Sequence, residues 1–545
     1  MASHRRGIVR VYLKKVSVKN YSRLADLDID IRGHAVIVGA NDVGKTSLLR
    51  ILHMLLGAST AQIFQSLTPA DLRDPDKTLE VEVLLAGLGP DEWTVMPHEP
   101  SISGTDQSET LRIRLDAAID PGDPEAITVR RWFPDSGHDR GITREQLQAL
   151  GWRYLPATRG TATSQLEGPN SALHALLNAT ELGPERDSLA QLLKQLNGTL
   201  DASTALTALR ATVAGHLTKA MPTEFVPGDL SFRSGSDDTS VLDNVSLFFA
   251  RDGEHIPITE QSDGLRQLMQ MTLFDLAQGA ANIVAIDEPE LHLHPSSQRT
   301  VAELFIDAQN QKILVTHSPY IVARFDPSQV VAVTPDGRCQ QIGADKLNDV
   351  ARVQAHWWSP RLLEALTARK VIVVEGLADR LLIEAAAKAL RIGLDRLGIV
   401  VLDISGADNF PKVYKLLGPN GFNIPVFGLV DEKEKGIWHG AVGGRAAAVF
   451  GKKIFVCDPD LEAAYCQSLT PAAVAQILVD SGCARLDGIL QSCRASTLAD
   501  ITTPALATFC RGDKVTNAVA IGAALTAVSA QSITPLASLL HAAAQ

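Results

Sequence analysis

The sequence predicts an α/β protein in which two parallel-sheet domains follow one another and a helical insert interrupts the first. Three observations support this prediction: a phosphate-binding loop between a strand and a helix at 39–47, an apolar strand that ends in two carboxylates at 282–288, and a second series of strands and helices from about residue 370. Strands that alternate with helices form parallel sheets, whose carboxyl-terminal edge carries the functional residues.

The length and composition of the chain fit a multidomain protein. The chain has 545 residues, 45% of them hydrophobic and 21% charged, and no run approaches the 18 apolar residues of a membrane span. The amino-terminal residues lack the apolar core of a secretion signal, so we expect a cytoplasmic protein without membrane contact. Six cysteines without a C-x-x-C pair are expected to be reduced thiols. A net charge of −11 argues against wholesale coating of nucleic acid but leaves room for a local DNA groove with a metal ion.

The stretch from Gly39 to Ser47 fits the pattern Gly-x4-Gly-Lys-Ser/Thr. An apolar strand at 35–38 precedes it and a helix at 47–56 follows, so backbone N–H groups and a helix N-terminus converge on an anion. Lys45 is expected to reach the β- and γ-phosphates of ATP, and the Thr46 hydroxyl to join the shell of a Mg²⁺ ion. The residues expected to contact the nucleotide are Asn41, Gly44, Lys45, Thr46 and Ser47.

Around this loop, residues 9–38 and 78–135 alternate between apolar and polar positions, which indicates half-buried strands. Tyr21 lies where an aromatic ring could stack on the base or pack between strands, and both interpretations are left open. From about 170 to 218 leucines fall at helical spacing, with breaks at 183–184 and 197–198. This insert is too short and interrupted for a long coiled coil.

A second element of the nucleotide site comes about 240 residues later. Residues 282–287 form an apolar strand that ends at Asp287 and Glu288. Asp287 is expected to bind the Mg²⁺ shell and Glu288 to polarise the attacking water. The alternative is a buried strand that ends in a solvated acidic turn.

Two stretches flank this strand. Ser262 and Gly264 precede an apolar helix whose N-terminus could receive a γ-phosphate. Residues 312–315 form a strand that leads into Thr316 and His317, and His317 is expected to contact the γ-phosphate. A lone histidine would more commonly be structural, so this role depends on the order of the motifs.

That order resembles the ATP-binding-cassette (ABC) heads of SMC-like and OLD-family (overcoming lysogenization defect) ATPases. The resemblance implies a head-to-head homodimer, with ATP held between the phosphate loop of one subunit and Ser262 and Gly264 of the other. The stretch around Ser262 departs from the commoner Leu-Ser-Gly-Gly-Gln, which affects how the γ-phosphate is sensed. His292 and His294 lack an evident third metal ligand and are interpreted as loop residues of the dimer seam.

A second chemical centre begins with a buried strand at 371–374, which ends in Glu375-Gly376, with Asp379 one turn into the next helix. Further strands at 399–403 and 426–431 end at Asp403 and Asp431, and a strand at 454–457 is followed by Asp458. Divalent cations are the natural partners of carboxylates gathered at strand ends, and two such ions can activate water for phosphodiester cleavage. Ordinary acidic loops are the alternative.

This half resembles a Toprim domain, and its place behind the ATPase resembles the OLD-family nucleases. The resemblance rests on residues 405–412 and on the late acidic pair Asp460 and Glu462, and it implies that Lys514 lies near the scissile phosphate. One position departs from the family: Lys433 stands where the second Asp of Asp-x-Asp is expected after Asp431. Either Glu432 or Glu434 substitutes, or the second metal is weakly held. The metal ligands implied are Glu375, Asp379, Asp431, Asp460 and Glu462.

The predicted fold is therefore an ABC-type ATPase head with a helical dimerisation insert, followed by a Toprim domain with a Rossmann-like parallel sheet. The predicted boundaries are head at 1–165 and 223–345, insert at 166–222, connector at 346–366, and Toprim domain with carboxyl-terminal helices at 367–545. The resemblance implies an ATP-regulated, Mg²⁺- or Mn²⁺-dependent DNA endonuclease or nickase in phage defence or DNA repair. The alternative is an ATPase sensor or scaffold whose degenerate Toprim domain recruits another effector. A helicase partner is left open.

Overall fold

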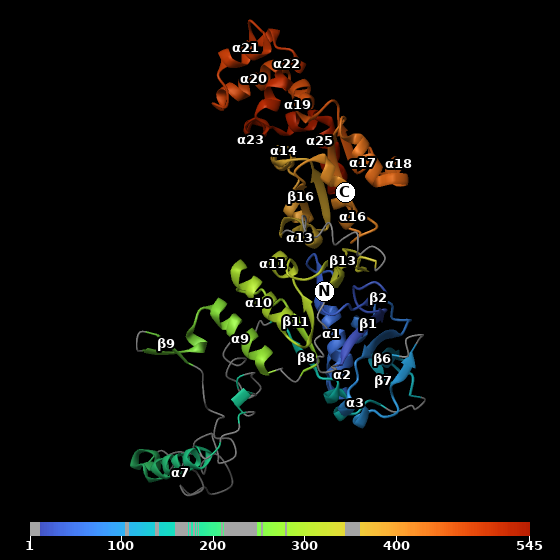
Figure 1. Cartoon of the computed structure of the whole chain (residues 1–545), viewed down its shortest axis with the longest axis vertical. Coiled ribbons are helices and arrows are strands. Elements are labelled where there is room, and N and C mark those ends of the chain that lie inside the picture. The colour runs from blue at the N-terminus through green and yellow to red at the C-terminus, as the bar shows by residue number, and fades with distance from the viewer. Residues whose placement is uncertain are drawn as a thin grey trace, which may run out of the picture. The chain divides into compact units, whose positions relative to one another are not determined.

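A computed structural model describes residues 11–103, 108–136, 141–157, 185–208, 248–251, 254–277, 281–343 and 360–545, together with single positions at 173, 176, 177, 180, 183 and 211 (Figure 1). The chain forms two compact units. The first contains Met1–Pro156, Ala281–Glu290 and Gln298–Gln545, and the second contains Ala157–Ala280 and Leu291–Ser297. The predicted insert boundaries at 166 and 222 and most of the predicted connector lie outside the described residues.

The first unit begins with an antiparallel sheet in the order β2-β1-β4-β6-β5, with β7 paired to β6. Its strands are β1 (Tyr12–Lys19), β2 (Leu27–Asp30), β4 (Leu79–Ala86), β5 (Ser101–Ser103), β6 (Ser108–Asp120) and β7 (Asp123–Trp132). Alternate residues of β4 are buried, as the sequence pattern predicts. Three short helices accompany the sheet: α2 (Thr60–Ser66), α3 (Pro90–Val95) and α4 (Arg144–Ala149).

The second sheet of this unit is largely parallel, in the order β14-β13-β3-β12-β11-β8. Its strands are β3 (Ala35–Gly39), β8 (Trp152–Leu155), β11 (Ile283–Asp287), β12 (Gln311–Val315), β13 (Val330–Val333) and the antiparallel edge strand β14 (Cys339–Gln340). Every residue of β3, β11 and β12 is buried, which is typical of parallel strands covered on both faces. Helices α10 (Pro295–Asp307) and α11 (Pro319–Val322) lie between the strands in sequence.

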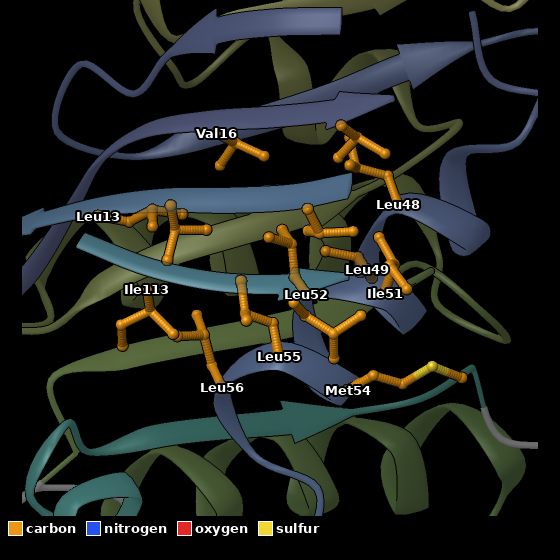
Figure 2. Close-up of a cluster of buried hydrophobic side chains, with 14 of the residues drawn as sticks. Leu13, Val16, Leu48, Leu49, Ile51, Leu52, Met54, Leu55, Leu56 and Ile113 are labelled. Carbon is orange, nitrogen blue, oxygen red and sulfur yellow. The ribbon is translucent and has the colours of Figure 1, made fainter. Parts of the chain in front are cut away.

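Helix α1 (Lys45–Leu56) follows the phosphate loop and buries eight of its residues, while Thr46 and Arg50 are exposed. Its buried leucines share one core with Leu13 of β1 and Ile113 of β6, and also with Ile283 and Ile313 of the parallel sheet. Figure 2 shows the side chains of α1, among them Leu48, Leu52 and Leu55, beside Leu13, Val16 and Ile113. A helix with a broad apolar face requires such cover from more than one element, and this packing fixes the phosphate loop on the scaffold.

The carboxyl-terminal part of the first unit has a four-stranded parallel sheet in the order β16-β15-β17-β18. Its strands are β15 (Lys370–Val374), β16 (Ile399–Asp403), β17 (Val426–Asp431) and β18 (Ile454–Cys457). Helix α13 (Pro360–Thr367) precedes the first strand, and the helices between the strands are α14 (Leu377–Ala389), α15 (Leu394–Leu397), α16 (Phe410–Leu417), α17 (Lys435–Val442) and α18 (Ala446–Val449). Three strands have the predicted ranges, and β15 begins one residue earlier than predicted.

Short helices follow the sheet: α19 (Leu461–Leu469), α20 (Pro471–Asp480), α21 (Leu486–Cys493), α22 (Thr503–Gly512), α23 (Lys514–Ala524), α24 (Ala527–Ser532) and α25 (Thr534–Ala544). They share a core with the strand residues Ile372 and Phe427. The expectation that this Ala-rich segment packs on the sheet is therefore confirmed. Cys457, Cys466 and Cys510 are buried, and none of the six cysteines is in a disulfide.

The described part of the second unit includes α7 (Glu185–Ala202), the hairpin of β9 (Phe248–Arg251) and β10 (Glu254–Pro257), and α9 (Asp263–Ala277). The predicted break at Asn197-Gly198 is wrong, because α7 runs through both residues. One glycine costs a helix only about 1 kcal/mol relative to alanine, which a helix of this length tolerates.

The structure also bears on the expectations for Tyr21 and for membrane-spanning helices. The stacking role considered for Tyr21 is wrong, because its side chain is only 1% exposed and belongs to the core of the antiparallel sheet. Burial raises the pKa of its phenol to about 12. Among the described helices, none has the length and apolar character needed to cross a bilayer.

Candidate functional site

The ends of three neighbouring strands bring the predicted nucleotide-binding motifs together. In the parallel sheet, β12 lies between β3 and β11, and Val315 is paired with Ile37 on one side and with Asp287 on the other. The phosphate loop, the Thr316-His317 segment and the carboxylate pair therefore leave the sheet at the same edge. The assignment of this edge as a nucleotide site stays a prediction.

The phosphate loop has the backbone that its glycines permit. Gly44 adopts a φ of 100° just before α1 begins at Lys45, and a Cβ atom there would come within 2.9 Å of Leu24. The Lys45 ammonium donates to the carbonyl oxygens of Gly39 (3.1 Å) and Ala40 (2.5 Å), so it closes the loop on itself. Burial lowers the pKa of Lys45 to about 8. A nucleotide phosphate would offer this ammonium a full negative charge in place of two carbonyl groups.

Thr46 and Asp287, the two residues predicted to hold Mg²⁺, are hydrogen-bonded to one another. The Thr46 hydroxyl donates to Asp287 Oδ1 at 3.3 Å, and the other carboxylate oxygen, Oδ2, is buried without a hydrogen-bond partner among the described residues. Burial, with Glu288 next to it, raises the pKa of Asp287 to about 6. A hydroxyl beside a carboxylate with a free buried oxygen is a donor set that suits Mg²⁺. Thr46 and Asp287 would hold the ion, which would supply positive charge to offset that of the phosphates.

Glu288 follows directly and adopts a φ of 49°, uncommon for a residue with a side chain. Its backbone N–H donates to Val315 O at 2.9 Å, which fixes the turn that separates its carboxylate from that of Asp287. The two acids therefore face different surroundings, as different roles require.

Sequence reasoning missed Glu290. Its carboxylate accepts hydrogen bonds from the Thr316 hydroxyl (2.8 Å) and from the His317 backbone N–H (2.6 Å), so it fixes the segment that carries the imidazole. Burial raises the pKa of Glu290. Burial also lowers the pKa of His317 to about 4, with a further contribution from Lys45, so this imidazole is neutral at physiological pH. The signal available was a third acid two residues after Glu288.

Ser262 and Gly264 lie in the second unit. Ser262 is exposed just before α9, and its carbonyl accepts the Arg266 N–H at 2.9 Å. Gly264 lies within the first turn, where a Cβ atom would come within 3.0 Å of His292 O. His294 accepts the Ser296 N–H at 3.3 Å near the start of α10. The γ-phosphate role of Ser262 and Gly264 remains a prediction.

A second acidic centre lies at the carboxyl-terminal edge of the four-stranded sheet. Glu375 follows β15, Asp431 ends β17, and Glu434 follows three residues later. One carboxylate oxygen from each of these residues lies within 4.8 Å of the others, and the Asp431 N–H donates to Glu375 Oε1 at 3.3 Å. Three carboxylates at this separation are a donor set that fits a divalent cation.

Burial and mutual repulsion raise the pKa values in this centre. Burial, followed by Asp379 and Glu434, raises the pKa of Glu375 to about 7. Burial, followed by Glu375, Asp379 and Glu462, raises the pKa of Asp431 to about 8. A bound cation would offset the negative charge of these carboxylates and lower the pKa values of Glu375 and Asp431.

The structure shows where Lys433, which departs from the Asp-x-Asp pattern, and its two neighbouring glutamates lie. The Lys433 side chain is 88% exposed, and its ammonium pairs with Glu434 at 3.4 Å. Glu432 pairs with Lys435 at 3.0 Å and does not join the cluster. Of the two candidate substitutes, Glu434 is therefore the one placed with Glu375 and Asp431. A short turn before α17 brings it back to the strand end.

The other predicted ligands surround this cluster without joining it. Asp379 accepts the Gly376 N–H at 3.0 Å, and burial raises its pKa to about 6. The Lys514 ammonium lies 3.1 Å from Glu462. Burial alone would lower the pKa of Lys514, but Glu462, with Asp431 and Asp379, raises it. The positive charge of Lys514 therefore interacts with several of the predicted metal ligands.

Asp460 has two partners of its own. Its Oδ2 atom accepts from Arg511 Nε at 2.7 Å and lies 2.6 Å from Nη2, and its Oδ1 atom accepts the Ala463 N–H at 2.9 Å at the start of α19. Sequence reasoning missed Arg511. The signal was its position three residues before Lys514.

The loop at 405–412 supports the centre through its backbone. Gly406, at a φ of 117°, donates its N–H to Glu375 O at 2.7 Å. Asn409 donates its amide N–H to Ile404 O at 2.9 Å, which closes the turn. The loop therefore fixes the backbone of Glu375 without using its carboxylate.

Family models match three stretches of the chain. Residues 12–114 match an AAA ATPase domain, residues 149–323 match an AAA domain described as "putative AbiEii toxin, Type IV TA system", and residues 366–432 match the "Overcoming lysogenization defect protein-like, TOPRIM domain". These matches cover the phosphate loop, the Asp287–Glu288 pair and the Glu375–Asp431 centre. The chain is therefore similar to OLD proteins in its carboxyl-terminal part. It joins an ATPase domain to a Toprim domain, as the sequence predicts.

Three relatives match most of the chain at low identity. The OLD nuclease of Thermus scotoductus is 24% identical over 421 residues, which cover 72% of this chain and 77% of the relative. Endonuclease GajA of Bacillus cereus is 19% identical and covers 72% and 70%, and the Old nuclease of Escherichia phage P2 is 21% identical and covers 73% and 74%. Each of these alignments covers more than two thirds of this chain and of the relative.

Proposed function

We propose that this protein is an OLD-family, divalent-metal-dependent DNA endonuclease or nickase whose Toprim centre is governed by ATP in the ABC-type head. The observation that carries the proposal is the convergence of Glu375, Asp431 and Glu434 at one strand edge, with Lys514 nearby. All three carboxylates are half-buried, and the pKa values of Glu375 and Asp431 are raised, so a divalent cation would favour their charged forms. The nuclease names of the three relatives add support.

In this proposal Glu375, Asp431 and Glu434 hold the first Mg²⁺ or Mn²⁺ ion, with Asp379 close to it. A bound ion would supply Lewis-acid stabilisation of the phosphate and an activated water. The chain's own residues orient the reaction: the loop at 405–412 fixes the Glu375 backbone, and Lys514 offers a cation to the scissile phosphate. Asp460 and Glu462 are the ligands proposed for a second ion.

In the head, Lys45 and the phosphate loop bind ATP, while Thr46 and Asp287 hold Mg²⁺. We assign Glu288 to polarising the attacking water and His317 to contacting the γ-phosphate as a neutral donor. Ser262 and Gly264 would complete the site of a second subunit, so ATP binding favours a homodimer of heads. The exposed Ser262 beside the start of α9 is consistent with this role. Dimer formation would then control access of DNA to the Toprim centre.

The alternative function, an ATPase sensor with a degenerate Toprim domain, was motivated by Lys433. The exposed position of Lys433 and the place of Glu434 in the cluster remove that motive. We therefore retain the nuclease, acting in phage defence or DNA repair, as the proposed function.

Nicking of supercoiled plasmid in Mn²⁺ tests the proposal. Wild type converts the plasmid to open circles or linear DNA, whereas Glu375→Gln, which keeps the shape of the side chain, does not. Glu384→Gln on the outer part of α14 is the matched control and cuts like wild type. Equal cutting by wild type and Glu375→Gln would overturn the assignment.

A further inference from the structure

The acidic side chains of the Toprim centre fall into two groups with different partners. Glu375, Asp431 and Glu434 face one another, and within the described chain their one ion pair is with the exposed Lys433. Asp460 and Glu462 each have a cation of their own, Arg511 and Lys514 respectively. The first group is open to a metal ion, whereas protein cations already neutralise the second group.

The contacts of the second group are close and use most of the carboxylate oxygens. Two guanidinium nitrogens of Arg511 lie 2.6 and 2.7 Å from Asp460 Oδ2. Asp460 Oδ1 is engaged at the start of α19. The Lys514 ammonium lies 3.1 and 3.3 Å from the two oxygens of Glu462. An incoming ion would have to displace at least one cation from these oxygens.

Exposure distinguishes the cations from their partners. The side chains of Arg511 and Lys514 are 35% and 45% exposed, whereas those of Asp460 and Glu462 are 15% and 5% exposed. The cations can therefore turn towards solvent while the carboxylates stay in place. Arg511 lies in the last turn of α22 and Lys514 begins α23, so both flank the corner at Gly512-Asp513. A phosphate group that arrives at this corner would meet both cations.

From these contacts we propose that the Toprim centre binds one divalent ion in the absence of DNA, and that Arg511 and Lys514 block the second ion position until a DNA phosphate draws them away. This inference rests on the proposed nuclease function. Arg511 is a positioning residue in it, since it holds Asp460 and sets when that carboxylate becomes available. The centre would then complete its metal set only with substrate present.

Counting bound Mn²⁺ by the electron paramagnetic resonance signal of the free ion tests this proposal. All samples are full-length protein without nucleotide and carry Asp287→Asn, so that an ion in the head does not enter the count. The protein that carries Asp287→Asn alone is called the parent and is expected to bind one Mn²⁺ per chain. Adding Arg511→Met to the parent is expected to raise the count to two. Arg485→Met, which removes an exposed arginine before α21, is the matched control and is expected to bind one.

A second arm adds a short duplex DNA to the parent at low temperature, and the count is expected to rise from one to two. Lys514→Met provides a second variant, again with two ions expected without DNA, in case Arg511→Met does not fold; circular dichroism checks each variant. Two ions in the parent without DNA, one ion in both variants, or a count that DNA leaves at one overturns the inference. No bound Mn²⁺ in any sample overturns the proposed nuclease function itself.

Discussion

A carboxylate oxygen of Glu434 lies within 4.8 Å of one from Asp431, although Lys433 takes the place of the second acid of the Asp-x-Asp motif. The turn after β17 directs Lys433 into solvent and returns Glu434 to the strand end. The motif is therefore displaced by one residue in this chain, and the metal-binding chemistry can be retained.

This displacement predicts different effects for two neighbouring glutamates. Glu434→Gln should weaken Mn²⁺ binding by about tenfold or more, because a neutral amide replaces an anionic ligand. Glu432→Gln should leave the affinity unchanged, since Glu432 pairs with Lys435 outside the cluster. Isothermal titration without nucleotide measures both constants. Loss of affinity in Glu432→Gln alone would show that the other glutamate is the ligand.

The raised pKa values predict a pH dependence. In the metal-free protein the pKa of Glu375 is about 7 and that of Asp431 about 8, whereas in the unfolded chain both carboxyls titrate near pH 4. The folded state thus binds more protons, and its stability from these groups is present at low pH and is lost as the pH rises through about 7 to 8. A metal ion must displace the same protons, so its affinity rises over this range.

Thermal melts should therefore show a larger gain from Mn²⁺ at about pH 8.5 than at about pH 6. In Asp431→Asn, which removes the group with the higher pKa, this difference should shrink, because fewer protons compete with the ion. The same gain at both pH values in wild type would mean that these carboxyls do not take up protons in the folded protein.

Glu288→Gln in the head should lower kcat for ATP hydrolysis by about 10²- to 10⁴-fold, because a general base that polarises water contributes this much. ATP binding should persist, since Lys45, Thr46 and Asp287 are unchanged. Glu303→Gln, on the exposed face of α10, is a control for loss of a nearby charge. Steady-state hydrolysis and equilibrium binding of a fluorescent nucleotide separate the two effects. A normal kcat would exclude Glu288 from catalysis.

Glu290 is predicted to act through the backbone. Glu290→Ala leaves the Thr316 hydroxyl and the His317 N–H without their acceptor and should destabilise the head by about 1–3 kcal/mol. Glu290→Gln retains one acceptor oxygen and should restore most of the stability. Chemical denaturation measures both changes. A wild-type midpoint for Glu290→Ala would mean that these two bonds contribute nothing.

The elements around both centres could be predicted because they follow strong local patterns. The apolar strands at 35–38, 282–287 and 371–374 end at glycine or acidic residues. The first two belong to one sheet and the third to another, and within each sheet the parallel strands place such ends on the same edge. Glu290 and Arg511 could not be predicted, because their roles come from partners 26 and 51 residues away in the chain. The break expected in α7 failed because propensity alone does not end a long helix.

The most direct test of the account measures both activities in two variants of the full chain. Glu375→Gln is predicted to lose Mn²⁺-dependent plasmid nicking and to retain ATP hydrolysis, while Glu288→Gln loses hydrolysis and keeps the Toprim metal site, as Mn²⁺ binding reports. Nicking by Glu375→Gln at the wild-type rate would contradict the central claim that the carboxylates of the Toprim centre carry the nuclease chemistry.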